Sequence, residues 1–232
     1  MGDDLAPSRV MVASSARVLL FDLDGTLTDP RLGMVRSIRY ALDGLERPCP
    51  PDDVLASFIG PPLRRTFATL LETDDRARVE EAMTLYRERY ADVGLYENEL
   101  YDGIHEMLRD VKRAAARAFV ATGKPVVYAE RVIAHFELGR HFAGVYGPEL
   151  GGRFDDKAEL LAHLLATEQI AAKSAVMIGD RAADIIAARA NRVSSIGALW
   201  GYGSEEELRD AGADRLCAAP HELAECLMDL AH

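Results

Sequence analysis

The sequence predicts a doubly wound α/β fold, a parallel sheet with helices on both faces, into which an α-helical cap domain is inserted. Three observations lead to this prediction. From about residue 115 onward, short apolar runs alternate with amphipathic helical stretches, the order from which parallel sheets are built. A further apolar run lies at residues 18–21. The long segment between that run and residue 117 contains helical patterns and no convincing strand.

The core elements follow from the local patterns. Short apolar runs predict strands at residues 18–21, 117–122, 142–147, 174–180 and 192–199. Helical spacing predicts helices between them, at residues 127–138, 157–169 and 181–190. Ser204, followed three residues later by Glu207, is a capping-box pattern that begins another helix, and residues 220–230 form the last one.

The cap is expected as a block of helices after the first strand. Helical patterns cover residues 31–46, 62–72 and 76–93, and turn-forming residues at 47–53 and 60–62 separate them. We therefore assign residues 30–99 to the cap domain. Residues 17–29 and 100–232 form the expected α/β core, and residues 1–16 are expected to be a flexible leader.

Composition and charge narrow the class of protein. The 232 residues are 49% hydrophobic and 28% charged, which is typical of a soluble globular protein. Apolar runs are too short for a membrane span, and the N-terminal segment is acidic where a signal peptide is basic. Three cysteines without metal-ligand spacing favour a reducing, cytoplasmic setting. The net charge of −11 argues against nucleic-acid polymers, so an anionic substrate needs a few placed cations or a metal ion.

The chemistry is expected where the first strand ends, in the stretch FDLDGTLTD at residues 21–29. Ligands bind at the carboxyl ends of strands in open parallel sheets. Residues two apart in an extended chain point the same way, so Asp22 and Asp24 are expected to face one pocket, where they need a cation or a shared proton. Gly25 allows a sharp turn, after which backbone N–H groups can bind an anion. An Asp-Gly turn with solvated acids is the weaker interpretation of so long a motif.

Other strand ends carry matching groups. FVATGKP ends in Thr122, a hydroxyl donor for a phosphoryl oxygen, and GRFDDKAELL places Lys157 at the start of a helix. AVMIGDRAAD places Asp180 at a strand end and Asp184 four residues later, on one face of the following helix. Singly, Thr122 is equally well interpreted as a turn threonine, Lys157 is better interpreted as a surface lysine, and the two aspartates could belong to a solvated helix N-terminus. Together they make coincidence a poor explanation.

In this order the motifs resemble those of the haloacid dehalogenase superfamily of phosphohydrolases, whose core is Rossmann-like. DLDGTLTD resembles its first motif, VATGKP its second, Lys157 its third and GDRAAD its fourth. The resemblance extends from about Arg17 to the C-terminus. FIGPPL at residues 58–63, GGRFDDK and LWGYGSEEELRDAGAD are similar to the phosphoglycolate phosphatase-like branch. Gly123 and Arg192 depart from the family pattern, where Ser or Asn and Gly are commoner.

The resemblance implies a Mg²⁺-dependent phosphatase that hydrolyses a small phosphomonoester, phosphoglycolate being the model substrate. Asp22 is expected to attack phosphorus and form an aspartyl-phosphate. Asp24 is expected to protonate the leaving alkoxide and then to deprotonate the hydrolytic water. Mg²⁺ is expected on the Asp22 carboxylate, the Asp24 backbone carbonyl and Asp180. Asp184 would orient Lys157 or a metal-bound water.

The substrate contacts follow from the same motifs. Thr122 and Lys157 are expected to hold the phosphoryl oxygens, assisted by backbone groups around Gly25, Thr26 and Gly123. In the cap, GPPLRRTF places Arg64 and Arg65 at the start of a helix. One or both could pair with a substrate carboxylate or second phosphate, or both could belong to a solvated basic helix end. These two interpretations stay open.

Several activities of the same fold stay open as well. They are a 5′-nucleotidase, a β-phosphoglucomutase-like mutase and a phosphonatase, with a non-catalytic binding or regulatory protein as the less favoured alternative. A dehalogenase has no alkoxide to protonate and does not need Asp24, so the first motif favours a phosphoester. The expected partner is a small phosphorylated metabolite, with no nucleic-acid polymer and no membrane. Monomer and homodimer are not distinguished.

Overall fold

The computed structural model describes residues 17–230, without the side chains of residues 113–116. Its core is a six-stranded sheet with the order β5-β4-β1-β6-β7-β8, and each neighbouring pair is parallel. The strands are β1 (Arg17–Phe21), β4 (Ala115–Ala121), β5 (Gly144–Tyr146), β6 (Ala175–Gly179), β7 (Ser194–Ala198) and β8 (Arg215–Cys217). The predicted doubly wound α/β fold is confirmed. The predicted leader, residues 1–16, lies outside the described residues.

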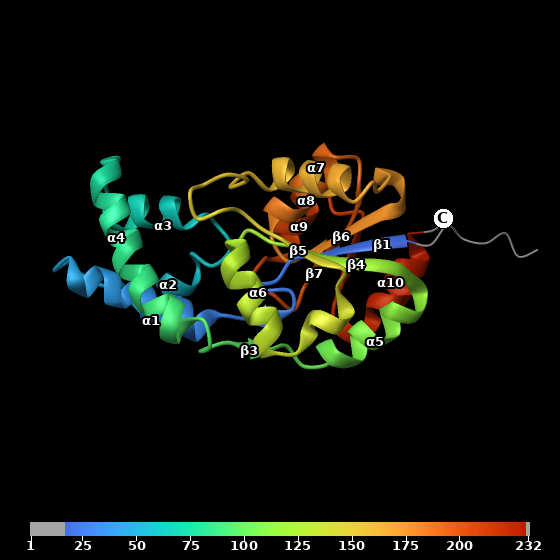
Figure 1. Ribbon diagram of the computed structural model, residues 1–232, viewed down its shortest axis with the longest axis horizontal. Coiled ribbons are helices and arrows are strands. Elements are labelled where there is room, and N and C mark those ends of the chain that lie inside the picture. Colours follow the sequence, from blue (N-terminus) through green and yellow to red (C-terminus); the bar gives the residue numbers. More distant parts are fainter. Residues whose placement is uncertain (1–16, 231–232) are drawn as a thin grey trace, which may run out of the picture.

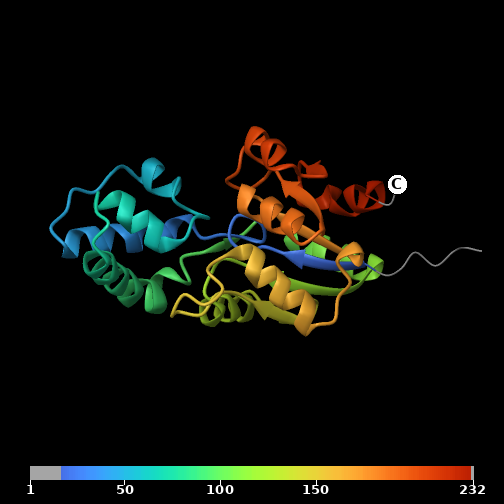
Figure 2. The ribbon, with the colours of Figure 1, turned by 90° about the horizontal axis from the view of Figure 1, so that it is seen from above.

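Helices cover both faces of the sheet (Figures 1 and 2). One face carries α7 (Lys157–Thr167), α8 (Ala182–Ala190) and α9 (Glu205–Ala211), and the other α5 (Ile104–Ala114), α6 (Val126–His135) and α10 (Leu223–Asp229). Alternate residues of β1 point to opposite faces. Val18 and Leu20 join the apolar cluster that contains Leu161 of α7, whereas Leu19 and Phe21 join the cluster that contains α5, α6 and α10. Burial on both faces explains why β1 is a continuous apolar run.

The helices between β2 (Thr28–Asp29) and β3 (Glu99–Leu100) lie beyond the carboxyl ends of the sheet strands, at the left of Figures 1 and 2. They are α1 (Arg31–Gly44), α2 (Asp52–Ala56), α3 (Leu63–Leu70), α4 (Arg76–Arg89) and the π-helical turn η1 (Tyr90–Gly94). The chain enters and leaves this helical layer through β2 and β3, which pair antiparallel. Three short 3₁₀ turns complete the description, η2 (Leu138–His141), η3 (Ala172–Ser174) and η4 (Pro220–Glu222).

Local details support individual sequence predictions. The Ser204 hydroxyl accepts a hydrogen bond from the Glu207 backbone N–H at 3.0 Å, so the Ser204 half of the predicted capping box is confirmed. The Glu207 carboxylate instead accepts from Arg181 and Ala182. Arg192 has a φ of 57°, in the left-handed region that glycine favours. A glycine would adopt this angle more easily than an arginine.

The three cysteines, Cys49, Cys217 and Cys226, are all unpaired. Every helix within residues 17–230 is too short or too polar to span a lipid bilayer.

Candidate active site

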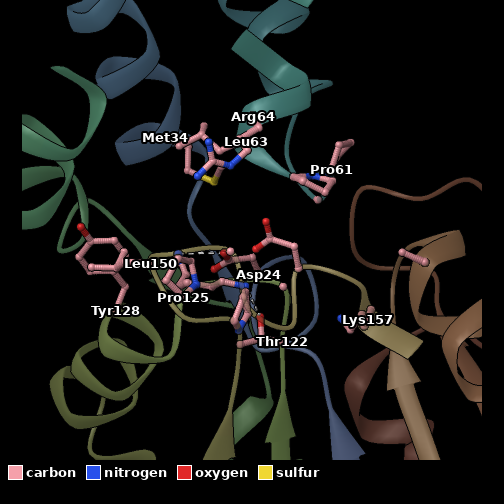
Figure 3. A pocket seen from close by; sticks show the side chains of 18 of the residues that line it. Asp24, Met34, Pro61, Leu63, Arg64, Thr122, Pro125, Tyr128, Leu150 and Lys157 are labelled. Atoms are coloured by element: carbon pink, nitrogen blue, oxygen red, sulfur yellow. Dashed lines mark hydrogen bonds and ion pairs between the residues drawn. The ribbon is translucent and has the colours of Figure 1, made fainter. Parts of the chain in front are cut away.

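A cavity of about 270 Å³ lies between the carboxyl ends of the strands and the helical layer. Figure 3 shows its two sides. Asp24, Thr122, Pro125 and Lys157 lie on the side of the sheet, and the opposite side carries Met34, Pro61, Leu63 and Arg64. Of the predicted residues, Asp22, Asp24, Thr122, Lys157 and Asp184 line this one cavity, whereas Asp180 is fully buried and does not line it. The parallel topology therefore brings together groups that are up to 162 positions apart in the sequence.

The turn after β1 holds the first two aspartates in place. The Asp22 backbone N–H donates to the Ile178 carbonyl at 2.9 Å and so continues the ladder to β6. Gly25 has a φ of 89°, and its N–H donates to the Thr28 carbonyl at 2.7 Å. A Cβ at Gly25 would lie 2.2 Å from Asp180 Oδ2, so only glycine allows the turn to pass so close to that carboxylate.

Three buried carboxylates converge beside this turn. Asp22, Asp180 and Asp184 each offer one oxygen atom, and these atoms lie within 4.8 Å of one another. The Thr26 hydroxyl donates to Asp180 Oδ1 at 3.1 Å, and the Tyr202 backbone N–H donates to Oδ2 at 2.8 Å. These two contacts fix the orientation of the Asp180 carboxylate beside the other two acids.

Lys157 is the cation of this cluster. It is the first residue of α7, whose start is capped by the Asp156 side chain accepting from the Ala158 and Glu159 N–H groups. The Lys157 Nζ atom lies 2.9 Å from Asp22 Oδ1 and also forms an ion pair with Asp184 Oδ1. The other Asp184 oxygen accepts from the Arg181 N–H at 3.0 Å. Asp184 therefore caps the start of α8 and also holds the ammonium group against Asp22.

The pKa shifts follow from this crowding. Burial, then Asp184 and Asp22, raise the pKa of Asp180 to about 8. Burial raises the pKa of Asp184 to about 6, although Lys157 acts against it. Burial alone would lower the pKa of Lys157, but the Asp184 and Asp22 carboxylates outweigh it and raise the pKa above its ordinary value. Three clustered acids, two of them paired with one ammonium group, form an oxygen-rich, electronegative site that suits a hard divalent cation.

The second motif contributes more than the predicted threonine. The Thr122 hydroxyl accepts from the Lys124 backbone N–H at 3.2 Å. The Lys124 ammonium lies 2.8 Å from Asp24 Oδ2 and donates to the Tyr90 hydroxyl. Burial raises the pKa of Asp24, and Lys124 acts against this effect. Sequence reasoning missed Lys124 and Tyr90, because a lysine two residues beyond a strand-end threonine has no signal of its own.

The remaining predicted residues lie in different surroundings. Arg64 lines the cavity and pairs with Glu80 of α4, whereas Arg65 is exposed and does not line the cavity. Thr26 is fully buried with its hydroxyl turned to Asp180. Gly25 and Thr26 are not among the cavity-lining residues. Gly123 does line the cavity and is exposed, and a side chain there would have open space.

The chain is similar to known hydrolases and to one protein that is named a kinase. A family model described as haloacid dehalogenase-like hydrolase matches residues 19–198. A 5′-nucleotidase from Pseudomonas aeruginosa is 46% identical over 200 residues, which are 86% of this chain and 90% of that protein. A phosphoglycolate phosphatase from Xanthomonas campestris is 30% identical over 90% of this chain and 95% of its own. A tyrosine-protein kinase PtkA from Mycobacterium tuberculosis is 36% identical over 82% of this chain and 64% of its own.

Among solved structures, a predicted phosphatase from Clostridium acetobutylicum superimposes with a TM-score of 0.88 and 34% identity. That match covers 92% of this chain and 99% of the other. The similarity therefore includes both the sheet and the helical layer over it.

Proposed function

The chain belongs to the haloacid dehalogenase-like hydrolase family, and on that premise we propose that it is a Mg²⁺-dependent phosphatase acting through an aspartyl-phosphate on Asp22. That the chain is a phosphomonoester hydrolase follows from the family and from its phosphatase relatives. The assignment of the site depends on one observation. Asp22, Asp180 and Asp184 direct carboxylate oxygens to one point, with Lys157 against two of them.

The donor set fits the proposed metal. Mg²⁺ prefers carboxylate and carbonyl oxygens and binds through few protein ligands. The possible ligands here are the carboxylates of Asp22, Asp180 and Asp184 and the backbone carbonyl of Asp24. Asp22 and Asp180 would hold the ion together with the Asp24 carbonyl, and Asp184 lies close enough to take part. When bound, the metal would neutralise charge on the phosphoryl oxygens and on the nucleophile.

The chemical steps are assigned to residues of this chain. An Asp22 oxygen attacks phosphorus, and the bond to the leaving oxygen breaks as Asp24 gives that oxygen a proton. Asp24 then takes a proton from the water that attacks the aspartyl-phosphate, which restores Asp22 and releases phosphate. Thr122 and Lys157 hold the phosphoryl oxygens during both steps. The helical layer excludes bulk water from the cavity.

The identity of the leaving group is a finer part of the proposal. The side of the cavity opposite the acids is largely apolar and includes Met34, Pro61 and Leu63 (Figure 3). Such a wall suits a leaving group with a larger apolar body than glycolate. The relative with 46% identity is named a 5′-nucleotidase. We therefore rank nucleoside 5′-monophosphates beside phosphoglycolate as candidate substrates. The unpaired cysteines support a cytoplasmic location.

An assay of phosphate release tests this proposal. The protein is incubated with p-nitrophenyl phosphate, phosphoglycolate and AMP, in Mg²⁺ and in EDTA. Release of phosphate in Mg²⁺ that stops in EDTA and returns with added Mg²⁺ is expected. The Asp22→Asn variant is the control for contaminating phosphatases, because it removes only the nucleophile. Metal-independent release, or release by that variant at the wild-type rate, would contradict the proposal.

A further inference from the structure

Lys124 joins the two layers of the molecule at the edge of the cavity. It follows β4 in the core, and its side chain is only 4% exposed. Its ammonium group lies 2.8 Å from Asp24 Oδ2 and also donates to the hydroxyl of Tyr90, which belongs to η1 in the helical layer. The same nitrogen lies 4.9 Å from the centroid of the Tyr90 ring, close enough for a cation–π contact. One buried cation thus contacts an acid of the core and an aromatic side chain of the cap.

Packing fixes Tyr90 in this position. Its ring stacks on Tyr86 of α4, with centroids 5.0 Å apart and planes at 18°, and meets Tyr128 of α6 edge-on at 5.6 Å and 79°. Tyr90 is 2% exposed. The ring therefore has little freedom to leave Lys124 while the helical layer lies against the core.

Building on the proposed function, we infer that Lys124 is a positioning residue that aims Asp24 at the leaving-group oxygen, with Tyr90 as its contact in the cap. Asp24 keeps its second oxygen, Oδ1, buried and without a hydrogen-bond partner among the described residues. That oxygen is free to meet the leaving group while Oδ2 is held by Lys124. Lys124 also donates its backbone N–H to the Thr122 hydroxyl at 3.2 Å, so a single residue orients two groups of the site.

The alternative, that Lys124 binds a substrate anion directly, fits the geometry less well. Its ammonium group already contacts a carboxylate and a hydroxyl and is almost fully enclosed. A consequence of the inference is that moving the cap away from the core breaks the contact with Tyr90. The orientation of Asp24 then depends on whether the cap is closed.

The experiment compares two leaving groups. p-Nitrophenolate departs without a proton, whereas an alkoxide needs one from Asp24. The alkyl phosphate is the one that the wild type hydrolyses best among phosphoglycolate, glycerol 3-phosphate and AMP. For this substrate we expect Lys124→Met to lower kcat/KM about 10–100-fold, because acid catalysis contributes about 10²–10⁴-fold. For p-nitrophenyl phosphate the loss should stay below about threefold. We use kcat/KM because it reports only on the steps up to the departure of the leaving group, and not on hydrolysis of the aspartyl-phosphate.

Two further variants show whether the effect passes through Asp24 and Tyr90. In an Asp24→Asn background, Lys124→Met should cause less than about a twofold further loss, because residues that act as a unit are not additive. Tyr90→Phe keeps the ring and its stacking and should lower kcat/KM for the alkyl phosphate about 3–10-fold. Matched controls are Lys173→Met, at an exposed lysine, and Tyr146→Phe, whose hydroxyl donates to Glu168 at 2.7 Å away from the cavity.

Each outcome is decisive. Equal losses for both leaving groups, or a rise in KM alone, would overturn the inference and favour direct binding of substrate by Lys124. Should Lys124→Met fail to fold by circular dichroism, a Tyr90→Phe variant with wild-type ratios would overturn it instead. A wild type inactive on every substrate would contradict the proposed function, and the inference would fall with it.

Discussion

Without a metal ion, the protein is expected to lose stability as the pH rises from about 4 to about 8, and Asp180 is the main cause. Burial and the neighbouring acids raise its pKa in the folded protein from 3.8 to about 8. Between these values the folded state holds a proton that the unfolded chain releases. A rise in pH therefore favours unfolding. The usual behaviour of a salt-bridged aspartate, which stabilises more at higher pH, is reversed here.

The contribution of Asp180 to this pH dependence is bounded by one proton. A single bound proton changes the free energy of unfolding by at most about 1.4 kcal/mol per pH unit. Between pH 5 and pH 7 Asp180 therefore accounts for up to about 2.7 kcal/mol. At about 2–4 °C per kcal/mol for a chain of this length, that is a fall in Tm of roughly 5–11 °C. Saturating Mg²⁺ should remove the fall, because an ion that binds the carboxylate form stabilises the folded state.

The assay is thermal unfolding in EDTA at several pH values for the wild type and for Asp180→Asn. The Asn side chain does not titrate, so the Tm of the variant should fall less between pH 5 and pH 7 than that of the wild type. The substitution also changes the hydrogen bonds from Thr26 and Tyr202, but this lowers the Tm by a similar amount at each pH. Asp210→Asn, at an exposed position of α9, controls for the loss of one negative charge. Parallel Tm curves for the wild type and Asp180→Asn in EDTA would refute the reasoning.

Three further results are expected at the site. Asp22→Asn should lower kcat/KM at least about 10³-fold with an unchanged circular dichroism spectrum, because no other carboxylate replaces the nucleophile. Thr26→Val, which removes the hydroxyl that orients Asp180, should weaken Mg²⁺ binding about 10–100-fold, measured as the Mg²⁺ concentration for half-maximal activity; an unchanged half-maximal concentration would assign the hydroxyl a packing role only. Arg64→Ala should raise KM for substrates with a second anionic group at least about fivefold more than Arg65→Ala does, because Arg64 lines the cavity and Arg65 does not. Equal KM values for the two variants would show that Arg64 does not bind substrate.

The longer elements were predictable because their patterns repeat. Helices α1, α3, α4 and α7 and strands β1 and β6 lie within a few residues of the predicted ranges. Several short elements were not, although the three-residue strand β5 lies within its predicted range of 142–147. Strand β8 (Arg215–Cys217), helix α2 and the two-residue strands β2 and β3 are too short to show a period. Their conformations depend on neighbours that are distant in the sequence, such as β7 for β8.

The convergence of the site was predictable for a topological reason. Parallel strands end at the same edge of a sheet, so Asp22, Thr122 and Asp180 had to approach one another once the strands were assigned. The direction of individual side chains was not predictable. The Thr26 side chain points inward to Asp180, and the Arg65 side chain is exposed to solvent. A shift of one residue along the chain is enough to reverse the direction in which a side chain points. The proposed role of Lys124 depends on Tyr90, whose position follows from the packing of the helical layer.

The charges of the site suggest an order of binding. Four carboxylates and two ammonium groups gather at the edge of the sheet: Asp22, Asp180 and Asp184 around Lys157, and Asp24 paired with Lys124. If all are ionised the group carries two negative charges, and at about 4 Å each unpaired like-charge contact costs about 4 kcal/mol near a protein surface. A phosphomonoester dianion would add to this repulsion, and a chain with a net charge of −11 offers no long-range attraction to offset it. A divalent cation brings the group to neutrality. We therefore expect metal to bind before substrate, with KM for the phosphoester falling as Mg²⁺ rises and kcat at saturating substrate changing less.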